Sequence, residues 1–299
     1  MPKIPPRILN CVFFLYHSVD DAKAGKNSGG TGFFVGCPSY TEGKFFVYAI
    51  TNWHVAIRGG ASVVRVNKAG GGIDVFDLDP ADWHFKPAWH DLAIAEVHVR
   101  LPQHDFSFID PSMIATPEFI AQTGIGPGED IFMAGRFVDH DGADTNVPAV
   151  RFGNISVMPQ AIPQGTGAKN LPSYILDVHS RSGFSGSPVF VYRTLGSDLG
   201  NTQIISGPGS SFVRLLAIHW SQFPEKWEIE TGAALSAEES LPSDAKYVTG
   251  WSGMTLAIPA PALLELMDLP AIKQPRDKII SELRRESGDI PTLDSSPSA

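Results

Sequence analysis

Short apolar runs, separated by polar and glycine-rich turns, dominate the hydrophobic pattern of this chain. Short runs rich in β-branched and aromatic residues predict strands, because helices need longer amphipathic segments. Many short strands joined by turns are typical of an all-β sandwich or barrel, and the chain lacks the strand–helix alternation of a parallel sheet. The predicted strands cover residues 11–16, 31–36, 45–52, 63–66, 92–97, 130–135, 151–157, 173–178, 188–192, 215–220 and 253–259.

The segments between and after these strands carry loop and helix signals. Residues 20–32 are polar and glycine-rich and predict a loop, whereas 117–122 predicts a short helix within a linker. Near the C-terminus, 261–267 begins with a proline and 277–286 has one apolar face, so both predict helices. The second helix is expected to pack on the preceding strands, and docking to a partner is the alternative. We expect the Ser-, Pro- and Asp-rich tail 288–299 to be disordered.

Acidic residues gather at two places. Three aspartates lie in the turn-like segment 139–144, and a second group surrounds two prospective strand residues. A calcium site is conceivable at that second group, but the glycine and closing glutamate of an EF-hand loop are missing. We therefore interpret both as solvated loops and predict neither a metal ion nor a cofactor. The second group consists of Asp74, Asp77, Asp79 and Asp82.

Composition limits the classes of function. The 299 residues suffice for one large or two medium domains, and the net charge of −9 opposes binding to nucleic acid or to an anionic membrane. The two cysteines, Cys11 and Cys37, cannot build a disulfide framework, so we expect buried free thiols. No run approaches the ~18 apolar residues of a membrane span, and no signal-peptide core is visible, which favours a cytoplasmic protein.

The candidate chemistry begins at Ser185, which stands among small residues just before an apolar strand. A serine nucleophile needs a sharp turn that exposes its hydroxyl and aims backbone N–H groups at the same point. Gly183 and Gly186 permit the backbone angles that such a turn requires. Glycine–serine turns before strands are common, so this segment alone also fits an ordinary turn.

Two earlier segments add an imidazole and a carboxylate. His54 directly follows the buried run 45–52, and Asp91 stands at the start of the run 92–97. An imidazole can take the proton of a serine hydroxyl, and a carboxylate can hold that imidazole in one tautomer. The order His, Asp, Ser along the chain is that of the chymotrypsin arrangement.

With these residues the sequence resembles the trypsin-like peptidases of the chymotrypsin clan. It is closer to their disulfide-free bacterial branches, the HtrA type and the staphylococcal glutamyl endopeptidase type, than to digestive trypsins. The segments that carry the resemblance read T-N-W-H-V at 51–55, D-L-A-I at 91–94 and G-F-S-G-S-P-V-F at 183–190. The resemblance implies two six-stranded antiparallel β-barrels at 1–116 and 129–260, joined by a linker at 117–128 and followed by short helical segments at 261–287.

The resemblance also implies roles for the candidate residues. Ser185 would be the nucleophile, His54 the general base and Asp91 the group that orients the imidazole. The N–H groups of Gly183 and Ser185 would form the oxyanion hole. The substrate would be a protein or peptide that lies extended in the cleft between the barrels.

One position departs from the trypsin pattern. Trypsins carry an aspartate just before the serine, which receives a newly freed N-terminus after propeptide cleavage, but here the residue is Phe184. Phenylalanine cannot form that ion pair, so we predict no trypsin-like zymogen activation. A regulatory protein partner, or the substrate itself, that rearranges the oxyanion loop is our hypothesis for how activity is restrained.

Substrate preference rests on a smaller likeness. The I-H-W segment at 218–220 resembles the same region of the glutamyl endopeptidase, where this histidine and a hydroxyl residue bind an acidic side chain. The resemblance implies an acidic P1 residue, held by Ser180 and His219 with Trp220 beside them. P1 is the substrate residue whose carbonyl is attacked. The alternative is that His219 is an ordinary core histidine and the pocket takes small or aliphatic side chains.

Two other functions stay open at this point. A catalytically inactive homologue could bind peptides or act as a scaffold, and an esterase could use the same three residues. His90, directly before Asp91, is a second histidine that could be mistaken for the base.

Overall fold

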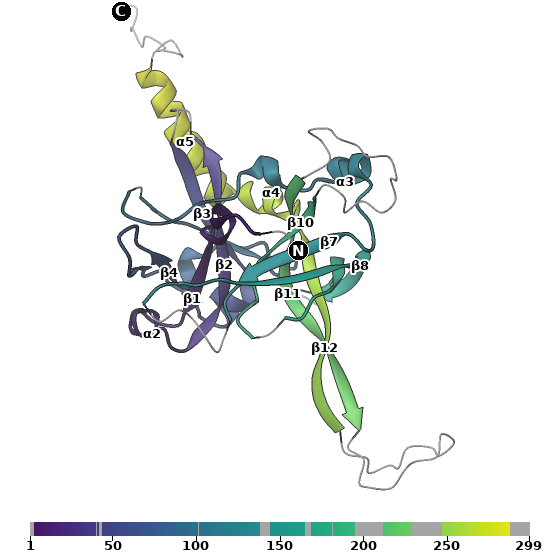
Figure 1. Ribbon diagram of the computed structural model, residues 1–299. Coiled ribbons are helices and arrows are strands. Elements are labelled where there is room, and N and C mark those ends of the chain that lie inside the picture. Colours follow the sequence, from purple (N-terminus) through teal and green to yellow (C-terminus); the bar gives the residue numbers. More distant parts are fainter. Residues whose placement is uncertain are drawn as a thin grey trace, which may run out of the picture.

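The computed structural model describes residues 3–39, 41, 44–100, 102–137, 144–164, 169–180, 182–194, 212–228 and 247–287. Two six-stranded antiparallel sheets form the framework of these residues (Figure 1). This arrangement confirms the predicted all-β fold class with two six-stranded units and C-terminal helices.

The cysteines Cys11 and Cys37 are free thiols, and burial raises the pKa of Cys11 to about 12.

The first sheet comes from the N-terminal third of the chain, and the second sheet closes into a barrel. In spatial order the first sheet contains β5 (Ile73–Phe76), β4 (Val63–Asn67), β1 (Val12–Tyr16), β2 (Ser28–Pro38), β3 (Phe45–Thr51) and β6 (Ala93–Glu96). The barrel contains β10 (Pro188–Arg193), β11 (Phe212–Glu228), β12 (Tyr247–Pro259), β9 (Lys169–Asp177), β8 (Ala149–Gln164) and β7 (Asp130–Gly135).

Strand β1 shows why the apolar runs lack polar–apolar alternation. Phe13 and Leu15 pack into the core of the first sheet, whereas Phe14 on the opposite face joins a cluster shared with the barrel. Phe132 of β7 and Phe190 of β10 belong to the same shared cluster. A strand that is covered on both faces must be apolar on both faces, because successive side chains point to opposite sides.

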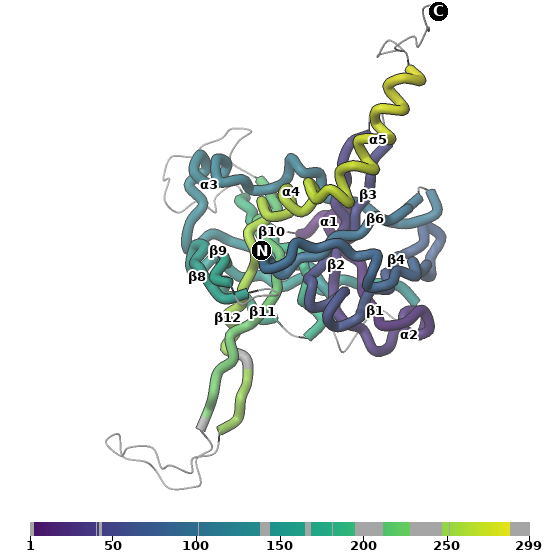
Figure 2. Tube along the Cα trace, turned by 180° about the vertical axis from the view of Figure 1, so that it is seen from behind, coloured from purple at the N-terminus to yellow at the C-terminus, as the bar shows by residue number. Residues whose placement is uncertain are grey.

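The helix α4 (Ala262–Met267) seals this shared cluster. Leu263 and Leu266 are buried in it beside residues of both sheets. In Figure 2, α4 and the start of α5 (Pro270–Glu286) lie across the back of both units. The two sheets and α4 therefore share one core, which holds the sheets together along the cleft between them.

Several boundaries differ from the prediction. The segment 20–32, predicted as a loop, contains α2 (Val19–Ala24) and the start of β2, because Ser18 caps the helix and Gly25 ends it at a φ of 67°. Helix α5 begins at Pro270, earlier than predicted. The strands β8, β9, β11 and β12 also run beyond their predicted ends, and β11 and β12 form an arm that projects from the barrel (Figure 1).

The remaining helical turns are short, and one of them involves the acidic group near residue 80. Asp79 caps η2 (Pro80–Asp82) and Asp82 bonds back to it, so these two carboxylates serve local structure. The other short helices are α1 (Pro6–Leu9), η1 (His54–Arg58), η3 (Pro111–Met113) and α3 (Pro117–Thr123).

Two predictions fall on segments that lie wholly or mostly outside the described residues. The tail 288–299 and the segment 139–144, apart from its last residue, are not among the described residues. Of the helices that the structure describes, none has the length and apolar character needed to cross a membrane.

Candidate active site

His54 is placed by a π-helical turn that follows β3. The N–H of Gly59 donates to the carbonyl oxygen of His54 at 3.0 Å, which closes the wide turn of η1. A methyl group at Gly59 would lie 2.8 Å from that oxygen, so this close approach requires glycine. The wide turn begins directly at the candidate base, and such turns are frequent at functional sites.

Asp91 holds both the ring and the backbone of His54. Its Oδ2 lies 2.5 Å from His54 Nδ1, and its Oδ1 accepts from the His54 N–H at 2.9 Å. A carboxylate can only accept, so the Nδ1 atom carries the proton and Nε2 keeps its lone pair. Asn52 donates to the carbonyl oxygen of Asp91 at 2.9 Å and fixes the loop behind it. The arrangement leaves Nε2 as the basic atom.

Ser185 lies in a turn between two glycines with left-handed backbone. Gly183 has a φ of 98° and Gly186 a φ of 86°, which side chains other than glycine rarely adopt. A methyl group on Gly186 would lie 2.1 Å from the carbonyl oxygen of Thr31, so the turn also needs glycine for lack of space. Phe184 is fully buried beneath the turn, while Ser185 is only partly buried.

Thr31 of β2 ties this turn to the first sheet. Its N–H donates to the carbonyl oxygen of Ser185 at 2.9 Å, and its hydroxyl donates to the carbonyl oxygen of Gly183 at 2.6 Å. The same hydroxyl accepts from the N–H of Arg136 at 2.9 Å. Two carbonyl groups of the serine turn are thus fixed by one residue of the opposite unit.

Gly30 shows how near the turn lies to η1. A methyl group on Gly30 would lie 3.0 Å from the carbonyl oxygen of Ser185 and 3.0 Å from Val55 Cγ1. The serine turn and the residue after His54 therefore pack around the same glycine. The structure brings His54 and Asp91 into direct contact and places the carbonyl oxygen of Ser185 near Val55, the residue after His54, without a hydrogen bond between His54 and Ser185 among the described residues.

The backbone amides of the serine turn are available. Among the residues that the structure describes, none accepts a hydrogen bond from the N–H of Gly183 or of Ser185. By contrast, the N–H of Gly186 donates to the carbonyl oxygen of His219 and that of Ser187 to Phe184, both at 2.9 Å. The two amides without partners are the two that the sequence predicted for an oxyanion hole.

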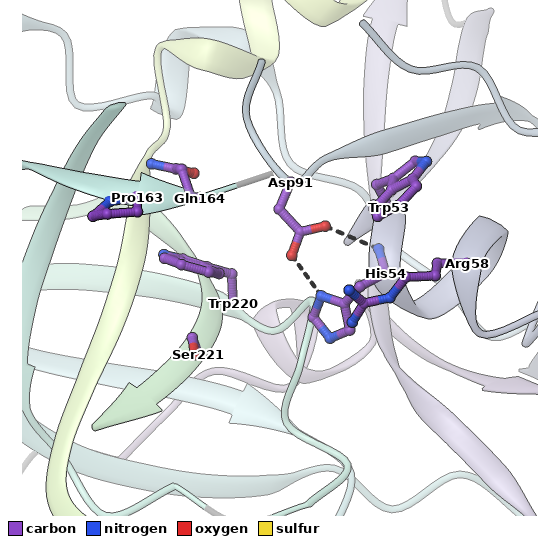
Figure 3. Close-up of a pocket in the computed structure, with 8 residues that line it drawn as sticks. All are labelled: Trp53, His54, Arg58, Asp91, Pro163, Gln164, Trp220 and Ser221. Carbon is purple, nitrogen blue, oxygen red and sulfur yellow. Dashed lines mark hydrogen bonds and ion pairs between the residues drawn. The ribbon is translucent and has the colours of Figure 1, made fainter. Parts of the chain in front are cut away.

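A cavity of about 320 Å³ opens beside the His54–Asp91 pair (Figure 3). Its walls come from η1, from the end of β8 and from β11. Figure 3 shows the imidazole of His54 and the indole of Trp220 on opposite sides of this space. The lining residues are Trp53, His54, Arg58, Asp91, Pro163, Gln164, Trp220 and Ser221.

Two of the predicted specificity residues, Ser180 and His219, are buried, and only the third, Trp220, lines this cavity. Ser180 and His219 are 6% and 1% exposed, and the hydroxyl of Ser180 and both ring nitrogens of His219 have no partner among the described residues. Burial lowers the pKa of His219 to about 4, although the nearby carbonyl of Phe184 opposes that shift. The ring of His219 is therefore neutral at pH 7.

Gln164 is a residue of the site that the sequence did not reveal. Its Oε1 lies 3.1 Å from His90 Nδ1, and its Nε2 donates to Ser173 Oγ at 3.2 Å, where Trp220 Nε1 also donates at 3.1 Å. This chain of hydrogen bonds links the residue before Asp91 to the cavity wall of the barrel. It also engages His90, and burial lowers the pKa of His90, so this second histidine serves the wall of the site.

Comparisons with known proteins give solved structures only. No protein-family model matches this chain, and no curated protein matches it. The structure of Deg5 matches at 13% identity and a TM-score of 0.45, over 87% of this chain and 88% of that one. The HtrA-type protease AlgW with a decapeptide matches at 18% and 0.41, over 81% of this chain and 51% of that one. The active form of the Rv3671c protease from M. tuberculosis matches at 15% and 0.40, over 89% of each.

Proposed function

We propose that this chain is a serine endopeptidase that cleaves proteins or peptides through an acyl-enzyme intermediate. The observation that carries the proposal is the pairing of His54 with Asp91. Both carboxylate oxygens of Asp91 bond to His54, one to the ring and one to the backbone N–H. This leaves Nε2 of His54 as the basic atom, and Val55, the next residue, packs beside the Ser185 turn.

The chemistry follows from the protonation states. His54 Nε2 takes the proton of the Ser185 hydroxyl as the oxygen attacks the substrate carbonyl, and Asp91 stabilises the imidazolium that forms. The N–H groups of Gly183 and Ser185 stabilise the oxyanion, each worth on the order of 3 kcal/mol. His54 then protonates the leaving amine, and water releases the acyl group by the reverse sequence.

Covalent labelling tests this proposal. A fluorophosphonate probe should label the wild-type chain, and Ser185→Ala should abolish labelling while the protein stays folded. The same substitution should lower kcat on a peptide substrate by roughly four to six orders of magnitude. A folded wild-type chain that neither takes up the probe nor cleaves a peptide library would instead support the inactive, peptide-binding homologue. Cleavage of esters but not of peptides would identify an esterase.

The finer proposal concerns the P1 side chain. Ser180 and His219 are buried polar residues whose side-chain hydrogen-bonding atoms have no partner among the described residues, which is costly unless a ligand satisfies them. A neutral imidazole with one N–H can donate to a glutamate or aspartate side chain at P1, and so can a serine hydroxyl. A P1 library decides the matter. A preference for Glu or Asp that is lost in His219→Ala supports the proposal, and a preference for small aliphatic residues contradicts it.

Regulation by a partner or substrate is a further part of the proposal. The amides of Gly183 and Ser185 already lack competing partners, so the resting site needs no rearrangement to free them. A regulator would then act on access to the cleft or on the position of the Ser185 hydroxyl. Labelling that rises when lysate is added, in the wild-type chain but not in Ser185→Ala, would support such a regulator. Equal labelling with and without lysate would contradict it.

A further inference from the structure

The polar groups that line the 320 Å³ cavity are mostly engaged by other residues. Asp91 uses both oxygens on His54. The amide of Gln164 bonds to His90 and to Ser173, and it also donates to the carbonyls of residues 171 and 172. The indole N–H of Trp220 donates to Ser173. The far wall of the cavity is therefore preformed and offers mainly the apolar face of an indole.

Arg58 is different. It is exposed, and it forms no hydrogen bond or ion pair with any other residue that the structure describes. Its guanidinium lies over the ring of Trp53, 5.6 Å from the ring centroid, a contact that holds the side chain at the rim. Figure 3 shows it directed toward His54, on the same side of the cavity. The cavity thus offers an indole face and one guanidinium that forms no ion pair among the described residues, within walls that also include the polar side chains of Gln164 and Ser221.

The cavity adjoins the point of attack without containing it, because Ser185 is not among the lining residues. Its other wall, Trp220 and Ser221, lies on β11 just beyond Ile218, the last residue that pairs with β10. This edge of β11 faces no other strand among the described residues, so an extended peptide can pair with it. The acyl part of a substrate, which stays on the serine, would then place one side chain in the cavity.

From these contacts we infer that Arg58 selects substrates with an acidic side chain at P2, the residue immediately before P1. The inference rests on the proposed peptidase function and adds a determinant separate from Ser180 and His219. The aliphatic part of a glutamate packs against Trp53 and Trp220, and its carboxylate pairs with the Arg58 guanidinium. Arginine suits this role because its planar fork can bind both carboxylate oxygens.

The test compares two peptides that differ only by Glu or Gln at P2. The wild-type chain should cleave the Glu peptide with a kcat/KM roughly two- to fivefold higher, the range expected for an exposed ion pair. Arg58→Gln should lower the rate for the Glu peptide to that for the Gln peptide, and Arg58→Lys should restore part of the preference. Arg7→Gln, at an exposed arginine of α1, makes the same change in net charge and should keep the full preference.

Equal rates for the two peptides in the wild-type chain would overturn the inference. An acid preference that persists in Arg58→Gln would also overturn it, as would an acid preference found at P1′, the residue after the cleaved bond, and not at P2. Binding of the same peptides to Ser185→Ala, measured by fluorescence anisotropy, separates this failure from failure of the proposed function. A further outcome is that the wild-type chain cleaves neither peptide, while the Glu peptide still binds more tightly than the Gln peptide and this difference disappears in Arg58→Gln. In that case the peptidase proposal fails and the Arg58 site stands.

Discussion

The N–H of Thr31 donates to the carbonyl oxygen of Ser185 across the boundary between the two sheets, at 2.9 Å. Its hydroxyl also bonds to Gly183, so one threonine of β2 fixes both ends of the segment that would bear the oxyanion hole. Preorganised amides stabilise developing charge well because they need not reorient during the reaction. The first sheet therefore contributes to the serine turn as well as to His54 and Asp91.

Replacing Thr31 by valine tests this contribution. Valine keeps the shape but leaves the carbonyl of Gly183 and the N–H of Arg136 without their hydroxyl partner. We expect the free energy of unfolding to fall by about 1–3 kcal/mol, and kcat to fall while KM changes little. Chemical denaturation and steady-state kinetics measure the two effects.

Thr255→Val is the matched control for this variant. Thr255 is equally buried, but its hydroxyl has no partner among the described residues. Its removal should leave stability unchanged or raise it, because a buried hydroxyl without a partner is unfavourable. If Thr255→Val lowers the free energy of unfolding as much as Thr31→Val does, the loss of stability comes from changing a buried threonine and not from losing the bonds to the serine turn.

Asp91→Asn should leave the fold intact and nearly abolish turnover. An amide N–H placed against His54 Nδ1 would force the ring proton onto Nε2, so the base loses its lone pair. We expect kcat to fall by about 10⁴. Asp74→Asn is the control, because Asp74 also pairs with a histidine, His104, at 3.0 Å outside the site. Kinetics that change equally in both variants would contradict the assignment of Asp91.

Gly186→Ala should destabilise the protein strongly. The new methyl group would meet the Thr31 carbonyl oxygen at 2.1 Å in a backbone with a φ of 86°. We expect the free energy of unfolding to fall by more than about 3 kcal/mol, or the protein to fail to fold. Gly128 has a φ of 89° but open space around it, so Gly128→Ala should cost only about 1–2 kcal/mol. Thermal unfolding of both variants separates crowding from backbone strain.

Stability should depend on pH through His219. Its pKa is lowered from 6.5 to about 4 in the folded state, so the unfolded chain takes up a proton at a higher pH than the native chain. The stabilisation is complete above pH 6.5 and is lost as the pH falls toward 4, by on the order of 3 kcal/mol. Denaturation curves across this range measure it.

His219→Asn should flatten this dependence between pH 6.5 and 4, whereas His17→Asn, at an exposed histidine, should retain it. If the wild-type curve and the His219→Asn curve have the same slope, another group accounts for the acid sensitivity. Buried His90 is the first candidate, because burial lowers its pKa in the same direction.

The sequence predicts the parts of this structure that depend on residue type and local order. The buried strands stand out as apolar runs, and His54, Asp91 and Ser185 are recognisable because each follows or precedes such a run. Helix α2 was missed because its residues are polar, although Ser18 and Gly25 are ordinary helix-capping residues. The polar composition of that segment predicted a loop, although its capping residues are typical of a short helix.

The residues that the sequence could not reveal act through contacts between distant segments. Thr31, Arg58 and Gln164 are unremarkable in their local sequence. Gln164 reaches Ser173 only because β8 and β9 pair far beyond their predicted ends, through segments interrupted by prolines and polar residues. Their roles depend on sheet register and on how the two units pack, which no local pattern encodes.

The hydroxyl bond from Thr31 to Gly183 spans 152 residues of chain, and the barrel that carries the serine closes only when β12 (Tyr247–Pro259) joins it. During synthesis on a ribosome, the imidazole and the carboxylate emerge long before their nucleophile can be held in place. A nascent chain that stops short of β12 thus lacks the closed barrel on which the serine turn is held.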